Sequence, residues 1–216
     1  MQSKSRTIGR DGPSFIEVAR RAQIVECAIE TIAAIGYAQA SLNQIAERAG
    51  ISKSVISYHF AGKDELIQQV LTDVSQAGAA LIWPRVQAET TSAGMLRAYI
   101  QSHLDFMRDH PKQVAAVSEI LLYHRAQTTA EHDTTPLEER LRQGQRDGEF
   151  RTFSPRLMAW TIRAALDEVA RQYVADPSLD LDEAARELAR NFALATTAHT
   201  PGLTHPDSGC QVSRGG

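Results

Sequence analysis

A short polar segment around residue 55 carries side chains that could read a DNA double helix. Hydroxyl, imidazole and amine groups can hydrogen-bond to base edges in the major groove, and a lysine can neutralise a phosphate. Ile56 and Phe60 are expected to point inward at helical spacing, which leaves the polar residues between and before them facing outward. The predicted DNA-contacting residues are Ser41, Ser52, Lys53, Ser54, Ser57, Tyr58, His59 and Lys63.

Two short helices joined by a tight turn are predicted to hold these side chains. Ser41 and Gln44 have the spacing of a capping box at the start of the first helix, and Gly50 supplies the left-handed residue that ends it. Ser52 is expected to cap the second helix. A glycine-containing turn of about four residues between two helices is the helix-turn-helix pattern, in which the second helix enters the major groove. A plain helical hairpin with a solvated polar face would show the same local signals.

The stretch from Glu17 to Ala77 resembles the N-terminal domain of the TetR family of transcriptional repressors. The residues that carry the resemblance are Ile24, Val25, Ala28, Ile29, Ile32, Gly36, Tyr37, Ser41, Ile45, Ala46, Ala49, Gly50, Ile51, Ser52, Tyr58, His59, Phe60, Lys63, Asp64, Glu65 and Leu66. Ser57 departs from the family pattern, which usually has an aromatic residue there. This departure weakens the expectation of a family-type base contact at Ser57, but it does not affect the expected fold.

The whole chain is predicted to be all-α, with a small DNA-binding head and a larger helical body. The expected divisions are a flexible arm at 1–14, a helix-turn-helix domain at 15–65 with its motif at 41–60, a ligand-binding and dimerisation domain at 66–198, and a disordered tail at 199–216. A long helix from Lys63 is expected to end near Trp83, because Pro84 restricts the residue before it. In the arm, Lys4, Arg6 and Arg10 could touch a phosphate or the minor groove, or the arm could be a frayed terminus. Arg20 and Arg21 could approach the DNA backbone or simply be solvated.

Composition and charge narrow the class of protein further. The 216-residue chain has a net charge of −3 and 43% hydrophobic residues, which suits a globular protein with a sizeable core. We expect no membrane span, because no apolar run approaches roughly 20 residues, and no secretory signal. Cys27 and Cys210 lie far apart, so a reducing cytoplasm is expected and a disulfide framework is not. The portion up to Lys63 is mildly basic and the remainder carries the acid, as expected of a DNA-reading head on a body that does not bind DNA.

The body is predicted to enclose a small-molecule site between its helices. The candidate lining residues are Trp83, Tyr99, His103, Phe106, Met107, Glu119, Tyr123 and Trp160. Aromatic and methionine side chains would provide adaptable apolar surface, with His103 or Glu119 as the polar anchor. Each of these residues could instead be an ordinary core or surface residue. A metal site would need His103, His110, His124 and Glu119 to converge, and neither a metal nor a cofactor is predicted.

A homodimer is expected, mostly because in the resembled family the last two helices pair with those of a partner. The residues that those two helices would carry toward each other or the partner are Leu157, Trp160, Thr161, Ala164, Ala165, Val169, Leu181, Ala185, Leu188 and Phe192. The chain has no glycine-rich phosphate loop and no nucleophile motif, so an enzyme is not predicted. The expected function is a cytoplasmic repressor that binds operator DNA and is released by a small molecule. The alternatives are an activator or ligand-independent regulator, a helical protein-interaction module, and a metal-dependent enzyme.

Overall fold

The computed structural model describes residues 14–124 and 133–198, and within these ranges it contains nine α-helices and no strand. The helices are α1 (Phe15–Ile35), α2 (Leu42–Arg48), α3 (Lys53–His59), α4 (Lys63–Ala88), α5 (Ser92–Asp109), α6 (Pro111–His124), α7 (Thr135–Arg146), α8 (Pro155–Ala175) and α9 (Leu181–Thr196). The predicted all-α class is confirmed. The predicted tail, and the predicted arm apart from Ser14, lie outside the described residues.

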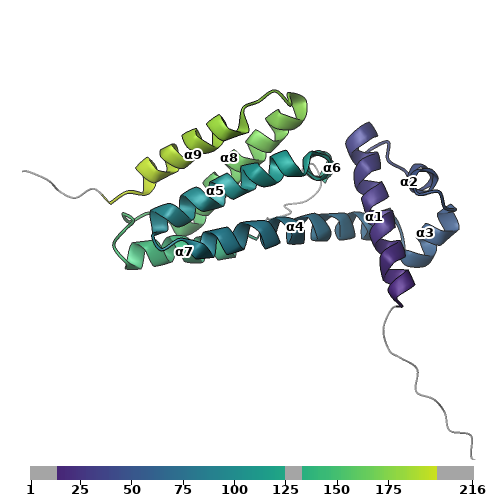
Figure 1. Cartoon of the computed structure of the whole chain (residues 1–216), viewed down its shortest axis with the longest axis horizontal. Coiled ribbons are helices and arrows are strands. Elements are labelled where there is room, and N and C mark those ends of the chain that lie inside the picture. Colours follow the sequence, from purple (N-terminus) through teal and green to yellow (C-terminus); the bar gives the residue numbers. More distant parts are fainter. Residues whose placement is uncertain (1–13, 125–132, 199–216) are drawn as a thin grey trace, which may run out of the picture.

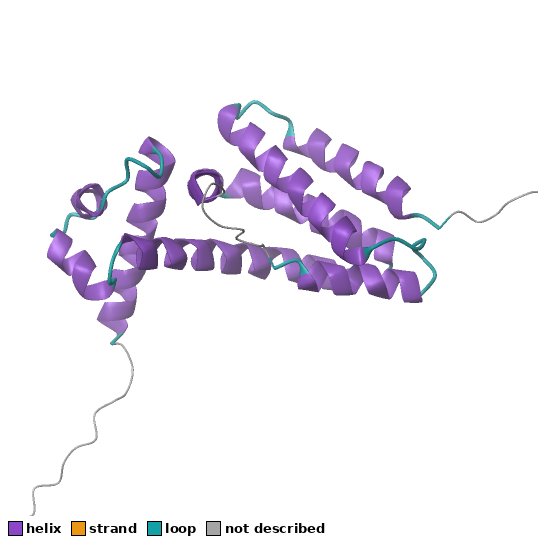
Figure 2. Ribbon diagram, turned by 180° about the vertical axis from the view of Figure 1, so that it is seen from behind, coloured by secondary structure: helices purple, strands orange, loops and turns teal. Residues whose placement is uncertain are grey.

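Helices α1, α2 and α3 form a head at one end of the molecule (Figure 1). Each helix turns one apolar face inward, and the shared core of the head buries Ile24, Ile32, Ile45, Ile56 and Phe60 almost completely. Helix α4 begins beside the head and runs on into the body, as views from opposite sides show (Figures 1 and 2). The head therefore joins the body through one continuous helix and through the packing of α1 on α6.

Helix α5 lies at the centre of the body. It packs chiefly against α4 and α9, while α8 packs against α6 and α7. Leu96, Ile100 and Leu104 recur at helical spacing along α5 and are buried, so this helix supplies much of the core. The body is thus a bundle whose interior is bounded by helices on several sides, the arrangement in which small-molecule sites form readily.

The helix ends follow the capping signals closely. Ser41 and Gln44 form the predicted capping box at the start of α2, and Gly50 ends that helix in the left-handed region with φ +66°. Ser14 and Glu17 form a second capping box at the start of α1. Ser52 stands at the N-cap of α3 as predicted, but its side chain makes no capping hydrogen bond. Its Oγ instead lies 2.8 Å from the Oγ of Ser54.

The predicted end of α4 at Trp83 is wrong, because the helix continues through Pro84 to Ala88. A proline inside a helix removes one backbone hydrogen bond and crowds the preceding turn, at a cost of about 3 kcal/mol. Pro84 lies on the exposed side of α4, whereas Ile82 and Val86 on either side of it are buried against the body. Burial of a side chain of the size of Val86 contributes roughly 1.5–3 kcal/mol, which offsets most of that cost and favours continuation of the helix past the proline.

Candidate DNA-binding surface and candidate ligand site

Helix α3 presents an exposed polar surface at the end of the head. Ser52, Lys53, Ser54, Ser57 and Tyr58 are all exposed. The buried Ile56 and Phe60 fix the opposite face of the helix in the core of the head, so these five side chains must point outward. At 3.6 residues per turn the four that belong to α3 form two rows, one with Lys53 and Ser57 and the other with Ser54 and Tyr58. Two parallel rows of donors and acceptors on one short helix have the dimensions of a surface that enters the major groove.

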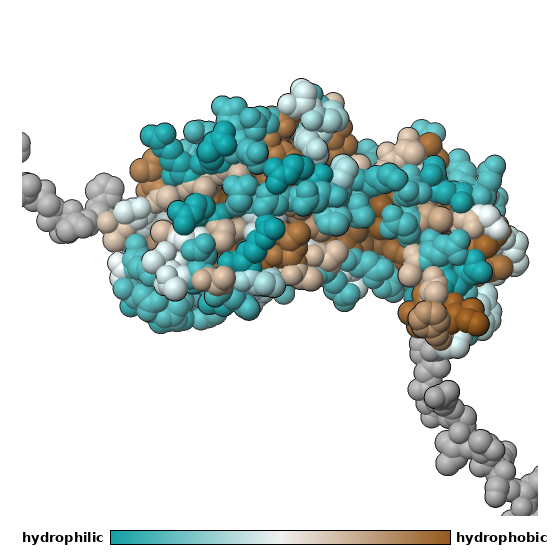
Figure 3. Space-filling view, in the orientation of Figure 1, coloured by the Kyte–Doolittle hydropathy of each residue, from teal (hydrophilic) through white to brown (hydrophobic). Residues whose placement is uncertain are grey.

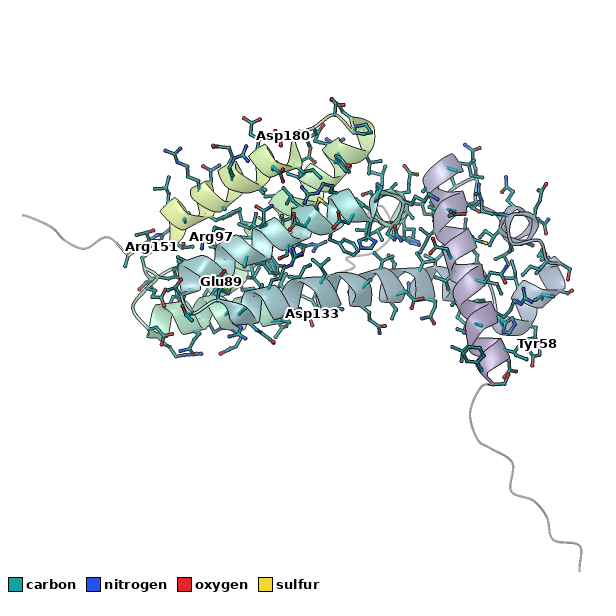
Figure 4. All side chains as sticks on the ribbon, viewed as in Figure 1. Tyr58, Glu89, Arg97, Asp133, Arg151 and Asp180 are labelled. Carbon is teal, nitrogen blue, oxygen red and sulfur yellow. The ribbon has the colours of Figure 1, made fainter. Side chains whose placement is uncertain are left out.

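Tyr58 is held by helix α1, although its side chain is 74% exposed. Its hydroxyl donates a hydrogen bond to Oε1 of Glu17 over 3.2 Å. The other oxygen, Oε2, accepts the Ser14 backbone N–H over 2.7 Å. These hydrogen bonds, from the Ser14 backbone first, then the Ser14 and Tyr58 hydroxyls, lower the pKa of the Glu17 carboxyl. Figure 4 places Tyr58 beside the N-terminal end of α1.

Arg21, which was predicted to approach DNA or to be solvated, joins α1 to α3 and to the start of α4. Its guanidinium donates to the backbone carbonyl of His59 at the end of α3. The same group lies 4.1 Å from the centre of the Phe60 ring and also reaches Gln69 and Glu65 on α4. Arg21 therefore fixes the C-terminal end of α3 against α1 and α4.

Two other predicted DNA contacts already have partners within the head. The Lys63 ammonium donates to the carbonyl of Tyr37 over 2.8 Å and lies 4.0 Å from the centre of that ring. Partial burial lowers the pKa of the Lys63 side chain. The Ser41 hydroxyl is engaged in the capping box with Gln44. A phosphate would reach Lys63 only by sharing or replacing its contact with Tyr37, which distinguishes it from the freely exposed Lys53.

Three of the predicted ligand residues form one cluster in the body. The ring centroids of Trp83 and Tyr99 lie 5.9 Å apart, and those of Tyr99 and His103 lie 4.3 Å apart. Nδ1 of His103 is 2.8 Å from the Tyr99 carbonyl, and Nε2 is 3.3 Å from Nη1 of Arg163. Burial, followed by the neighbouring Arg163 charge, lowers the pKa of His103 to about 3. His103 is therefore neutral near pH 7, with Nδ1–H as donor to the carbonyl and Nε2 as acceptor.

Arg163, which the sequence did not single out, adds a charge to this cluster. Its Nη2 makes an ion pair with Oδ1 of Asp167 over 2.9 Å, one turn along α8. Its Nε is buried and lacks a hydrogen-bond partner in the described part of the chain. A buried donor without an acceptor is unfavourable and rare in folded proteins. The cluster thus combines aromatic surface with one N–H group that can receive an acceptor oxygen.

The other predicted ligand residues lie in different surroundings. Phe106 and Met107 are buried on α5. Glu119 accepts the backbone N–H of Tyr37 over 3.4 Å, and Tyr123 packs against the Tyr37 ring at 4.6 Å, so both belong to the junction between body and head. Trp160 is 42% exposed beneath the guanidinium of Arg156. The structure therefore does not gather all eight residues into one site.

A hollow of about 370 Å³ lies between α1 and α2 and not within the predicted ligand residues. Its lining residues are Thr31, Ile35, Gln44, Glu47 and Arg48. The alternative of a metal site at His103, His110, His124 and Glu119 finds no support in the described ranges. No three His, Cys, Asp or Glu side chains converge there to hold a metal ion. His110 packs on Phe106 instead, and His124 packs beside Tyr37. None of the described helices is long and apolar enough to cross a membrane.

Comparison with known proteins identifies the family. The model of the bacterial regulatory proteins of the tetR family matches residues 24–70, which include the whole of α2 and α3. The uncharacterized HTH-type transcriptional regulator TtgW of Pseudomonas putida is 32% identical over 103 residues, which cover 48% of this chain and 72% of TtgW. The chain belongs to the TetR family. Its relatives in that family are transcriptional regulators and not enzymes.

Other members of the TetR family are similar over less of the sequence. The HTH-type transcriptional regulator BetI 1 of Chromohalobacter salexigens is 34% identical over 87 residues, which are 40% of this chain and 43% of BetI 1. The chain thus matches less than half the length of that relative. FadR from Bacillus subtilis, solved in complex with stearoyl-CoA, has the same fold, with a TM-score of 0.68 at 20% identity. That comparison covers 80% of this chain and 97% of FadR.

The surface expected to form a TetR-type dimer interface is split between the two final helices. On α8, Leu157 is 62% exposed and lies on the same side as Trp160, so this apolar face is only partly covered by the described residues, with Arg156 over Trp160. On α9, Leu181, Ala185 and Phe192 are buried, because that helix packs on α5. These three residues therefore belong to the core of one chain. The large exposed apolar residue on α9 is Leu194, which the sequence prediction did not include.

Proposed function

We propose that this protein is a transcriptional regulator that binds operator DNA as a homodimer and represses until a small molecule releases it. The observation that carries the proposal is the surface of α3. Lys53, Ser54, Ser57 and Tyr58 are exposed on a helix that is anchored in the head by the buried Ile56. Apart from the hydrogen bond between Tyr58 and Glu17, these polar side chains face outward, and they are of the types that contact base edges and phosphates in duplex DNA.

The proposal includes a homodimer because a single short helix offers few contacts to DNA. Two heads related by a two-fold axis would bind half-sites about 34–36 Å apart, and their contacts would add. The partly covered face of α8, with Leu157 and Trp160, and the exposed Leu194 of α9 would meet their counterparts in the partner. Exposed apolar side chains of this size are a surface that association would bury.

For the ligand we propose the cluster of Trp83, Tyr99, His103 and Arg163. Aromatic rings would contact the apolar part of the ligand, and Nε of Arg163 would donate to a carbonyl or carboxylate oxygen. Because His103 is neutral, it adds no second positive charge beside the Arg163 guanidinium. FadR from Bacillus subtilis, which shares this fold, was solved in complex with stearoyl-CoA, and an acyl group combines an apolar chain with a carbonyl oxygen. An acyl compound is therefore one class of ligand that fits the cluster.

Release would work through the junction between body and head. Glu119 on α6 accepts the Tyr37 backbone N–H, and Lys112 at the start of α6 pairs with Glu30 on α1. A ligand that shifts α6 or α4 would turn the head and change the distance between the two α3 helices of a dimer. A coupling of roughly 1–3 kcal/mol would lower operator affinity about five- to 150-fold, and DNA would lower ligand affinity equally.

Fluorescence anisotropy on duplexes selected from a random pool tests the proposal directly. The expected result is saturable binding by two chains or more per site, lost steeply as salt rises, because lysine contacts release counterions from the phosphates. A pool carried through selection that remains no better bound than random duplex would refute the DNA-binding function. Screening acyl and aromatic carboxylates for release then tests the ligand part separately.

A further inference from the structure

The recognition helix carries one large exposed aromatic residue, Tyr58, which belongs to the resembled TetR pattern, whereas Ser57 before it departs from that pattern. The family usually has an aromatic residue where this chain has Ser57, and here Tyr58 follows it. Consecutive residues of an α-helix point about 100° apart. Tyr58 therefore belongs to the row of Ser54 and not to the row of Lys53, and its ring leans toward α1 (Figure 4).

Glu17 on α1 is positioned to hold the side chain of Tyr58. Both of its oxygens are used: Oε2 accepts the Ser14 N–H over 2.7 Å, and Oε1 accepts the Tyr58 hydroxyl over 3.2 Å. The capping box fixes the carboxylate to the first turn of α1, so it is a stationary acceptor. Fixing an exposed side chain before binding spares the complex an ordering penalty, which is worth a factor of roughly two to ten in affinity for one side chain.

The hydrogen bond also decides what Tyr58 can offer to DNA. A phenol has one O–H donor, and here Glu17 accepts it. The Tyr58 oxygen is left with lone pairs only, so it can accept a hydrogen bond but cannot donate one to a phosphate. In the major groove the donors are the amino groups of adenine and cytosine. The Glu17 carboxylate beside it would also repel a phosphate placed at the same point.

We propose that Glu17 is a positioning residue that turns Tyr58 into an acceptor reading an adenine or cytosine amino group in each operator half-site. The inference rests on the proposed DNA-binding function and deepens it, because it names the group that Tyr58 recognises. The surface at the N-terminal end of α1, next to Tyr58, is apolar and does not suit a phosphate contact. Figure 3 shows apolar surface at the N-terminal end of α1, where Phe15 is 88% exposed and unsuited to bind phosphate.

The test is a base-substitution profile of the selected operator with the full-length protein. Tyr58→Phe keeps the ring and removes the oxygen, so it should lower discrimination at one base pair per half-site by roughly two- to ten-fold, the worth of one hydrogen bond. Affinity for random duplex and the salt slope should stay unchanged. A loss of the same size at every base pair would overturn the inference, because it is the signature of a backbone contact.

A double-mutant cycle separates positioning from structural support. In the wild-type background, Glu17→Ala should lower discrimination at the same base pair. In the Tyr58→Phe background it should cause no further loss of discrimination there. Any effect of losing the α1 cap is present in both backgrounds and therefore cancels in the comparison. Glu17→Gln keeps an acceptor oxygen and should rescue much of the discrimination. Glu26→Gln, which removes another exposed carboxylate of α1, is the charge control and should leave the profile unaltered. Equal effects of Glu17→Ala in both backgrounds would overturn the inference.

A measurement on the free protein keeps this inference distinct from the proposed function. Because the Tyr58 hydrogen bond helps to lower the pKa of the Glu17 carboxyl, Tyr58→Phe should raise that pKa in an NMR titration without DNA. An unchanged pKa would mean that the hydrogen bond is absent in solution, and the inference would fall. Failure of the wild-type chain to select any duplex would refute the DNA-binding function itself.

Discussion

Arg21 offers the sharpest test of how the recognition helix is held. Arg21→Met removes the guanidinium but keeps an unbranched side chain over the Phe60 ring. The substitution deletes a charge-assisted hydrogen bond to the His59 carbonyl, which is worth about 1.5–3 kcal/mol, and a cation–π contact worth about 0.5–1 kcal/mol. The Arg21 side chain is 34% exposed, so solvent screens part of both contributions. We expect the unfolding free energy to fall by about 1.5–3 kcal/mol.

Urea unfolding measures this loss, and hydrogen exchange of the α3 amides shows whether it is local. The matched control is Arg20→Met on the neighbouring residue. Arg20 donates a hydrogen bond over 2.7 Å to Gln23, three residues away on the surface of α1. A pair of that kind contributes about 0.2–0.5 kcal/mol. If Arg21→Met changes stability no more than Arg20→Met, or leaves α3 exchange unaltered, then Arg21 does not fix the recognition helix.

Three further predictions concern the body, the helix packing and the DNA contact. Because the folded-state pKa of His103 is lowered to about 3, the unfolded chain takes up the proton first, so stability should fall as pH drops from about 6.5 toward 3. Urea unfolding at pH 7.5 and 5 should show about 1–2 kcal/mol of this loss in wild type and not in His103→Gln. Gly144→Ala should lower stability by about 1–2 kcal/mol in thermal melts, because its Cβ would lie 2.4 Å from Phe150, whereas Gly62→Ala meets nothing within 4 Å. Lys53→Ala should reduce the salt slope of operator binding by about 0.9 per protomer, and an unchanged slope would place Lys53 away from phosphate.

Local signals in the sequence were enough to predict most helix ends in the head. Capping depends on residues three or four positions apart, so the Ser41–Gln44 pair and the turn at Gly50 could be identified from spacing alone. The same reasoning failed at Pro84, where a local rule favoured an end and the burial of Val86 favoured continuation. Burial in a tertiary core is set by the neighbouring helices, and their positions are not contained in a short stretch of sequence.

The pairing of side chains from distant helices could not be predicted in the same way. Arg163 lies 60 residues after His103, and Glu119 lies 82 residues after Tyr37. Helical periodicity shows which side of its own helix each residue occupies, but it contains no information on which helix lies opposite. Arg163 could have been identified as a site residue from its charge within an apolar helical face, since an arginine there needs a partner.

The junction contacts explain why the head and the body should respond to one another. Glu119 and Lys112 both lie on α6, and both bind α1 or the segment directly after it. Because α1 holds α3 through Arg21 and Glu17, a displacement of α6 would be carried through α1 to the recognition helix by contacts that already exist. Lys63 anchors the start of α4 to the same Tyr37 that contacts Glu119. The two connections between body and head therefore meet at Tyr37, and neither can shift without changing the surroundings of the other.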